Sequence, residues 1–320
     1  MSKFRKIDLS GVKTVKFDQR PTKAEIGRLG IPFDPDKPLG DFLDSLPGYL
    51  KAEDLLKLAS SIAEAKREGK SIIFMMGAHP LKVGLSAVII DLVENGFISH
   101  LAVNGAFIIH DVELAFFGRT SEEVAEGIAD GSFGMVEETP ALIFDALRAA
   151  RPQELGLGEA MGRFISEKKP RFAQFSVAAA CYDNDIPMTV HAAVGTDTIS
   201  QHPGFDGALF GELSHDDFLL FCQSVTGLSG GVVVNVGSAV ILPEVFLKAL
   251  TVARNIHGGI ADFVTANLDM IQHYRPNANV VTRPLEGRGR GYGITGHHEI
   301  MLPLLAAAVK HNFRKFSREI

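Results

Sequence analysis

Short runs of consecutive apolar residues alternate along this chain with longer segments in which apolar residues recur every three or four positions. The runs lie at 71–77, 100–105, 187–192, 230–239 and 261–267. Strands that are apolar on both faces and separated by helices are typical of a parallel sheet that is covered on both sides. The pattern therefore predicts an α/β fold with a doubly wound, mostly parallel, Rossmann-like sheet.

The helical period is clearest in segments that also carry helix start and stop signals. Such segments lie at 52–69, 80–96, 106–118, 243–255 and 299–313. A further helix is predicted to open at Ser214, after a long polar loop. Acidic first turns, basic last turns and a closing Gly support several of these assignments.

Three regions depart from this alternation. Residues 1–50 are rich in Pro and Gly and are expected to form an irregular N-terminal segment. Residues 51–320 are expected to form one Rossmann-like domain, with a helical insert at about 120–185. Residues 273–296 are rich in Gly and Arg and are predicted to be a long loop.

Composition narrows the class of protein. The chain has 320 residues, 46% of them apolar, and a net charge of −6. This acidity argues against nucleic-acid binding, which needs a basic face. Two cysteines cannot make a disulfide framework, and the sequence has neither a membrane-spanning apolar run nor a signal peptide. We expect a cytoplasmic globular protein.

Small and amide-bearing residues stand where the predicted strands end. Ligands of such sheets bind beyond the carboxyl ends of the strands, where Gly permits close approach and helix N-termini favour phosphate. The stretch NVGSAVILPE at 235–244 suits a diphosphate, although the usual GxGxxG and Walker patterns are missing. The candidates are Gly77, His79, Asn104, Gly105, Asn235, Gly237 and Ser238.

Histidines and nearby acids supply the candidate reactive chemistry. Among eleven histidines, His110 and His191 are the candidate bases. Asp197 lies in the long loop 189–207 and could hold a ribose or a cationic substrate group. The local patterns HDVE and GHHE match no metal-binding template.

The strand-end residues also resemble those of the deoxyhypusine synthase family over roughly 70–313. The stretch AVNGAFIIHDVELA resembles a family segment that carries glycines and acids, and Gly237 matches a glycine of the family's Gly-Gly-Gly strand end. The helix IMLPLLAAAV resembles the family's last helix. The resemblance implies an NAD-binding Rossmann-like fold and a homo-oligomer, a tetramer or a dimer. It adds these cofactor-binding candidates: Asp111, Thr196, Thr265, Ala266 and His297.

The catalytic set differs from that family. The imine-forming lysine of the family would fall near Arg283 or Pro284, where arginine cannot form an imine. The chain also lacks tryptophan, which the family uses against its substrate. The resemblance therefore implies a related fold and nucleotide pocket, with Arg283 as a catalytic candidate in place of the lysine.

Three functional hypotheses follow. The first is an NAD-dependent transferase or oxidoreductase that removes hydride from a small amine or hydroxyl substrate, using His110, His191, Asp197 and Arg283. The second is a metal-dependent hydrolase with His79, His110, His191 and Asp197 or Asp111 as ligands. The third is a non-catalytic nucleotide sensor. Each of the three would bind a small molecule.

Overall fold

The computed structural model describes residues 3–285 and 287–316 and contains a six-stranded, all-parallel sheet in the order β3-β2-β1-β4-β5-β6. The strands are β1 (Ile72–Met76), β2 (His100–Asn104), β3 (Met188–His191), β4 (Val232–Val236), β5 (Val264–Asp269) and β6 (Arg290–Thr295). Strand order reverses between β1 and β4, as in doubly wound sheets. The predicted fold class is confirmed.

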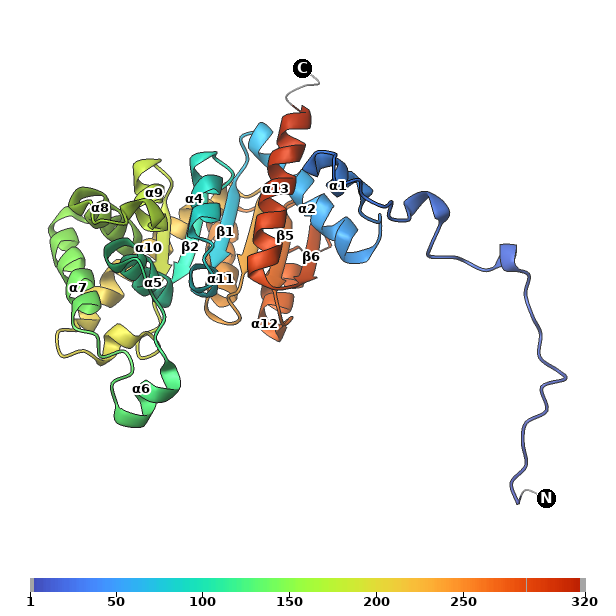
Figure 1. Ribbon diagram of the computed structural model, residues 1–320, viewed down its shortest axis with the longest axis horizontal. Helices are drawn as coiled ribbons and strands as arrows, with labels where there is room; N and C mark the ends of the chain where they lie inside the picture. Colours follow the sequence, from blue (N-terminus) through green and yellow to red (C-terminus); the bar gives the residue numbers. More distant parts are fainter. Residues whose placement is uncertain (1–2, 286, 317–320) are drawn as a thin grey trace. The chain divides into compact units, whose positions relative to one another are not determined.

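Helices cover both faces of this sheet (Figure 1). The helices of the described chain are α1 (Leu39–Ser45), α2 (Leu50–Arg67), α3 (His79–Lys82), α4 (Ser86–Glu94), α5 (Gly105–Phe117), α6 (Val124–Asp130), α7 (Glu138–Ala150), α8 (Leu157–Lys168), α9 (Val177–Asp183), α10 (Gly207–Thr226), α11 (Ile241–His257), α12 (Tyr274–Pro276) and α13 (His298–Phe316), of which α1 lies in the first of the two units described below. Helices α10 and α11 pack on one face, while α4, α9 and α13 lie on the other.

The core explains why the strands read as continuous apolar runs. Every residue of β1 and of β4 is buried, and alternate residues face opposite helix layers. Ile73, Met75 and Val233 pack with Phe221 of α10 and Phe246 of α11. Burial on both faces removes the alternation that a half-exposed strand would show.

The chain divides into two compact units, residues 1–53 and residues 54–320. Within the first unit, Arg28 stacks on Tyr49 and forms an ion pair with Glu53 at 2.8 Å. The second unit holds the sheet. No helix among the described residues is long and apolar enough to cross a membrane.

Two predicted elements differ from the structure. Helix α10 begins at Gly207, since Asp206 accepts hydrogen bonds from the N–H groups of Ala208 and Leu209, and Ser214 lies inside it. Strand β6 and the helical turns over 274–285 replace much of the predicted loop. The sequence pattern did not predict β6, because its glycines weaken the signal of a strand.

Candidate functional site

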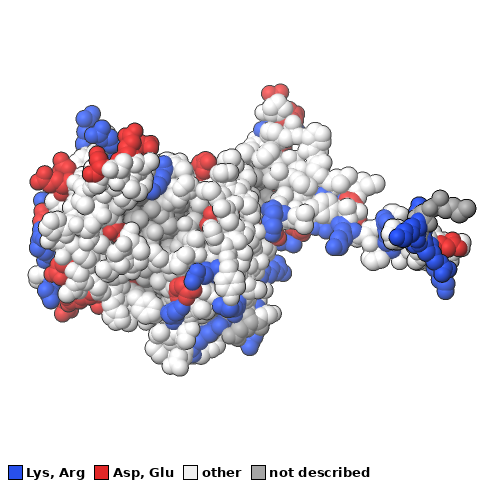
Figure 2. All heavy atoms as spheres, turned by 90° about the horizontal axis from the view of Figure 1, so that it is seen from below, with Lys and Arg blue, Asp and Glu red and all other residues white. Residues whose placement is uncertain are grey.

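A cavity of about 530 Å³ opens beside the carboxyl end of β2, where α5 begins. This size is typical of small-molecule sites. Its walls come from α5, from the segment 119–140 that contains α6, and from the loop after β3. Figure 2 views the molecule from the side of this sheet edge, and uncharged residues make up much of the surface there.

His110 enters the cavity from α5 and is the best placed of the predicted bases. Its Nδ1 lies 2.6 Å from the hydroxyl oxygen of Thr120, and that hydroxyl donates to Glu113. Because the only proton of the hydroxyl goes to a carboxylate, Thr120 accepts from the His110 Nδ1–H. The lone pair of His110 therefore lies on Nε2.

A second hydrogen bond orients the Glu113 carboxylate, which ends the His110–Thr120–Glu113 relay. The other oxygen of Glu113 accepts a hydrogen bond from Thr139 of α7 at 3.2 Å. Burial, and next the nearby Lys82 ammonium, lower the pKa of His110 to about 4. The ring is therefore neutral at physiological pH and can accept a proton at Nε2.

Asp197 lines the same cavity against the first turn of α5. Its side chain is buried, and a Cβ built on Gly105 would lie 2.0 Å from its Oδ2. Only glycine lets the carboxylate approach the helix so closely. Burial raises the pKa of Asp197 to about 6 although backbone N–H groups of Ala193 and Ala106 lower it. Thr196 lines the cavity beside it.

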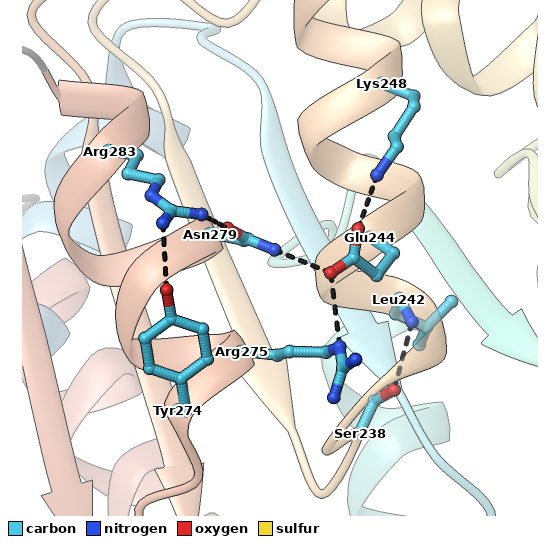
Figure 3. Close-up of polar contacts among 8 residues, drawn as sticks. All are labelled: Ser238, Leu242, Glu244, Lys248, Tyr274, Arg275, Asn279 and Arg283. Carbon is cyan, nitrogen blue, oxygen red and sulfur yellow. Dashed lines mark hydrogen bonds and ion pairs between the residues drawn. The ribbon is translucent and has the colours of Figure 1, made fainter.

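A second group of predicted residues meets where β1 and β4 end. A Cβ on Gly77 would lie 2.5 Å from the carbonyl oxygen of Gly237. Ser238 accepts a hydrogen bond from the Leu242 N–H, in the first turn of α11, at 3.2 Å (Figure 3). His79 lies nearby, with its ring centroid 5.3 Å from that of His298.

His298, at the start of α13, was given no role from the sequence. Its Nε2 donates to the carbonyl of Leu268 at 3.1 Å, and its ring covers Gly237. The preceding His297 is exposed and lies 3.8 Å from Glu299. The rim between β1 and β4 is therefore built from glycines and imidazoles.

Several predicted ligand residues lie inside the sheet instead of at its edge. Strand β5 ends at Asp269, so Thr265 and Ala266 are fully buried in its first half. Asn235 is also fully buried and donates to Asn267 at 2.7 Å, which ties β4 to β5. The resemblance implied cofactor contacts for Thr265 and Ala266, and the strand predicted over 261–267 ends two residues before the observed end of β5.

Two further predicted residues have structural partners. Asp111 accepts hydrogen bonds from Ser176, Val177 and Ala178, and so fixes the first turn of α9. Asn104 accepts from the Phe107 N–H at 3.1 Å and caps α5. Neither lines the cavity.

His191 is not at the cavity. Its ring is 3% exposed, lies 3.0 Å from the Thr189 hydroxyl and packs on Phe221. The same hydroxyl lies 2.9 Å from His100. Burial lowers the pKa of His191 to about 3, so this neutral network holds α10 against β2 and β3.

Arg283 belongs to a network on the other half of the sheet edge (Figure 3). It donates to Asn279 at 2.8 Å and to the Tyr274 hydroxyl at 2.9 Å. Asn279 in turn donates to Glu244 of α11 at 2.9 Å, and Arg275 lies 3.3 Å from the same carboxylate. The network joins the turns over 274–285 to α11 and does not line the cavity.

The ligands of the metal hypothesis are not brought together. His110 lies in the cavity, His79 at the end of β1, and His191 inside the protein. Within the described ranges, no three His, Cys, Asp or Glu side chains form a group that could hold a metal ion.

No protein-family model and no curated protein sequence matches this chain. Solved structures do match. A conserved LOR/SDH-type protein from Methanococcus maripaludis has a TM-score of 0.52 and 16% identity, and covers 82% of this chain and 70% of its own. A candidate deoxyhypusine synthase from Entamoeba histolytica has a TM-score of 0.51 and 12% identity, and covers 88% of this chain and 96% of its own.

AgrE, solved with ornithine and NAD⁺, is also similar, with a TM-score of 0.52 and 12% identity. The match covers 81% of this chain and 32% of AgrE, so this chain spans about a third of that protein's length. At such identities these likenesses show the fold. The fold is therefore deoxyhypusine synthase-like, as its strand ends predicted.

Proposed function

We propose that this protein is an NAD-dependent enzyme that removes hydride from the amine- or hydroxyl-bearing carbon of a small substrate held in the cavity. The observation that carries the proposal is the His110–Thr120–Glu113 relay, which leaves the lone pair of a neutral imidazole on Nε2. Proton removal by a positioned base is needed when hydride leaves such a carbon. The similar AgrE was solved with NAD⁺ and ornithine.

The edge between β1 and β4 fits a dinucleotide. Gly77 and Gly237 let the ends of β1 and β4 approach each other closely at this edge, and the first turn of α11 follows. The N–H groups of a helix N-terminus favour a diphosphate. His79, Ser238 and His297 lie around this edge, and NAD⁺ bound there would accept the hydride.

The protein's own part in the reaction is the movement of one proton. Nε2 of His110 takes the proton from the substrate hydroxyl or ammonium, and the imidazolium that forms remains bonded through Nδ1–H to Thr120. The Glu113 carboxylate stabilises this charge through the hydroxyl. Asp197 binds the polar group of the substrate near the start of α5.

The test compares His110→Gln with His257→Gln, a matched change at an exposed histidine near the end of α11. Activity is followed as NADH formation over a panel of amines and alcohols. We expect His110→Gln to lower kcat/KM about a hundredfold or more, as for loss of a general base. It should keep the rise in melting temperature that NAD⁺ gives. Equal activity of the two variants would contradict the assignment.

A further inference from the structure

Charged side chains of both signs line the cavity. The cations Lys82 and Arg119 are exposed, and within the described chain neither has an ion pair or hydrogen bond to the protein. Lys82 lies close enough to His110 to lower its pKa. Two unpaired cations beside a candidate base are suited to an anionic group of a ligand.

The acids of the cavity are not equivalent to one another. Glu113 is engaged by Thr120 and Thr139, and both oxygens of Glu122 accept the Gly134 N–H. Asp197 is 6% exposed, its Oδ2 lies against Gly105 at the start of α5, and no cationic side chain of the described residues pairs with its carboxylate. A buried carboxylate that lines a cavity and has no cationic partner is suited to a cationic ligand group.

The cations, the base and the buried acid reach the cavity from different elements. Lys82 comes from α3, His110 from α5 and Asp197 from the loop after β3. The remaining wall is mainly apolar. It includes Ile109, Phe117, Phe133, Val136 and Ile199.

We infer that the substrate is a small amino acid. Its carboxylate binds Lys82 and Arg119, its amino group binds Asp197, and its aliphatic side chain packs on the apolar wall. The amine-bearing carbon then faces His110. The chemistry at that carbon rests on the proposed function, whereas recognition of the two charges can be measured without NAD.

Isothermal calorimetry on three matched ligands tests this inference. Norvaline carries both charges, butan-1-amine lacks the carboxylate, and pentanoate lacks the amine. We expect norvaline to bind about tenfold or more tightly than either, the effect of one charge-assisted contact. Butan-1-amine binding as tightly as norvaline would overturn the inference.

Variants assign each charge to its partner. Lys82→Met and Arg119→Leu should weaken norvaline and pentanoate about tenfold and leave butan-1-amine unchanged. Asp197→Asn should weaken norvaline and butan-1-amine and leave pentanoate unchanged. Lys169→Met, at an exposed lysine outside the cavity, is the matched control. Variants that weaken all three ligands equally would overturn the assignment.

The two proposals fail separately. Amino-acid binding with this pattern but without NADH formation would leave the recognition site standing and contradict the proposed function. Suppose instead that the protein oxidises neutral alcohols, while neither norvaline nor any standard amino acid binds or changes its melting temperature. That result would leave the proposed function standing and contradict the recognition site.

Discussion

At the scale of single residues, the cavity depends on how hydrogen-bond donors and acceptors are shared. His110 is poised as a base only because the Thr120 hydroxyl must donate to Glu113 and so accepts from Nδ1–H. Both partners could have been suspected from the sequence. Glu113 lies one helical turn after His110, and Thr120 follows the end of the helix. Sequence alone could not show that the chain turns back to place Thr120 against the ring.

Thr120→Val tests this relay while keeping the shape of the side chain. The valine cannot accept from His110 or donate to Glu113, so the ring loses its fixed tautomer. We expect kcat/KM for NADH formation to fall about tenfold to a hundredfold. Thr120→Ser keeps the hydroxyl and should retain most activity. Full activity of the valine variant would show that the relay is structural.

Asp111 was a candidate ligand residue in the sequence, but in the structure its carboxylate stabilises the start of α9. Asp111→Ala would leave three donors of α9 without an acceptor. We expect a loss of about 3 kcal/mol in the free energy of unfolding, measured in urea. Asp111→Asn keeps one oxygen and should lose less. An alanine variant as stable as the parent would show that water replaces the carboxylate.

At the scale of elements, the apolar runs predicted the parallel sheet because buried strands have no polar face to confuse the pattern. The site was harder to predict, since a shift of two residues in the end of β5 moved Thr265 and Ala266 into the sheet interior. The long loop after β3 brings Asp197 to the cavity, and its role in function stays a prediction. Packing of segment 119–140 over α5 leaves no local signal in the sequence.

The first turn of α11 carries the proposed diphosphate site, and a charge placed there tests it. Val240 is exposed at its start and Ile256 is exposed near its end. Val240→Glu should repel the diphosphate and abolish the NAD⁺-dependent rise in melting temperature. Ile256→Glu, which places the same charge at the other end of the helix, should keep that rise. A loss in both variants, or in neither, would place the cofactor elsewhere.

At the scale of the whole molecule, buried titratable groups make stability depend on pH in two opposite ways. Burial lowers the pKa of His100 and His191 to about 3, so below pH 6.5 the unfolded chain binds protons that the folded chain does not. The contribution of these two histidines to stability is therefore lost as the pH falls below 6.5. Burial raises the pKa of Asp111 and Asp197 to about 6, which opposes this trend only at acidic pH.

Above pH 6.5 the pH dependence of stability comes mainly from one buried carboxyl group. Asp217 is fully buried on α10 and accepts hydrogen bonds from the N–H groups of Gly158 and Val190. Burial raises its pKa to about 8. The folded chain holds this proton at pH values where the unfolded chain has lost it. The contribution of Asp217 to stability therefore falls as the pH rises from 3.8 to 8.

We expect the free energy of unfolding to fall by about 2 kcal/mol between pH 6.5 and pH 8, as one raised carboxyl pKa requires. Asp217→Asn imitates the protonated acid and keeps an oxygen for the two N–H donors, so the decline should disappear. Asp262→Asn, at an exposed acid, should keep it. Urea unfolding at the two pH values measures both. A decline that survives in Asp217→Asn would mean that the buried carboxyl is already ionised at pH 6.5.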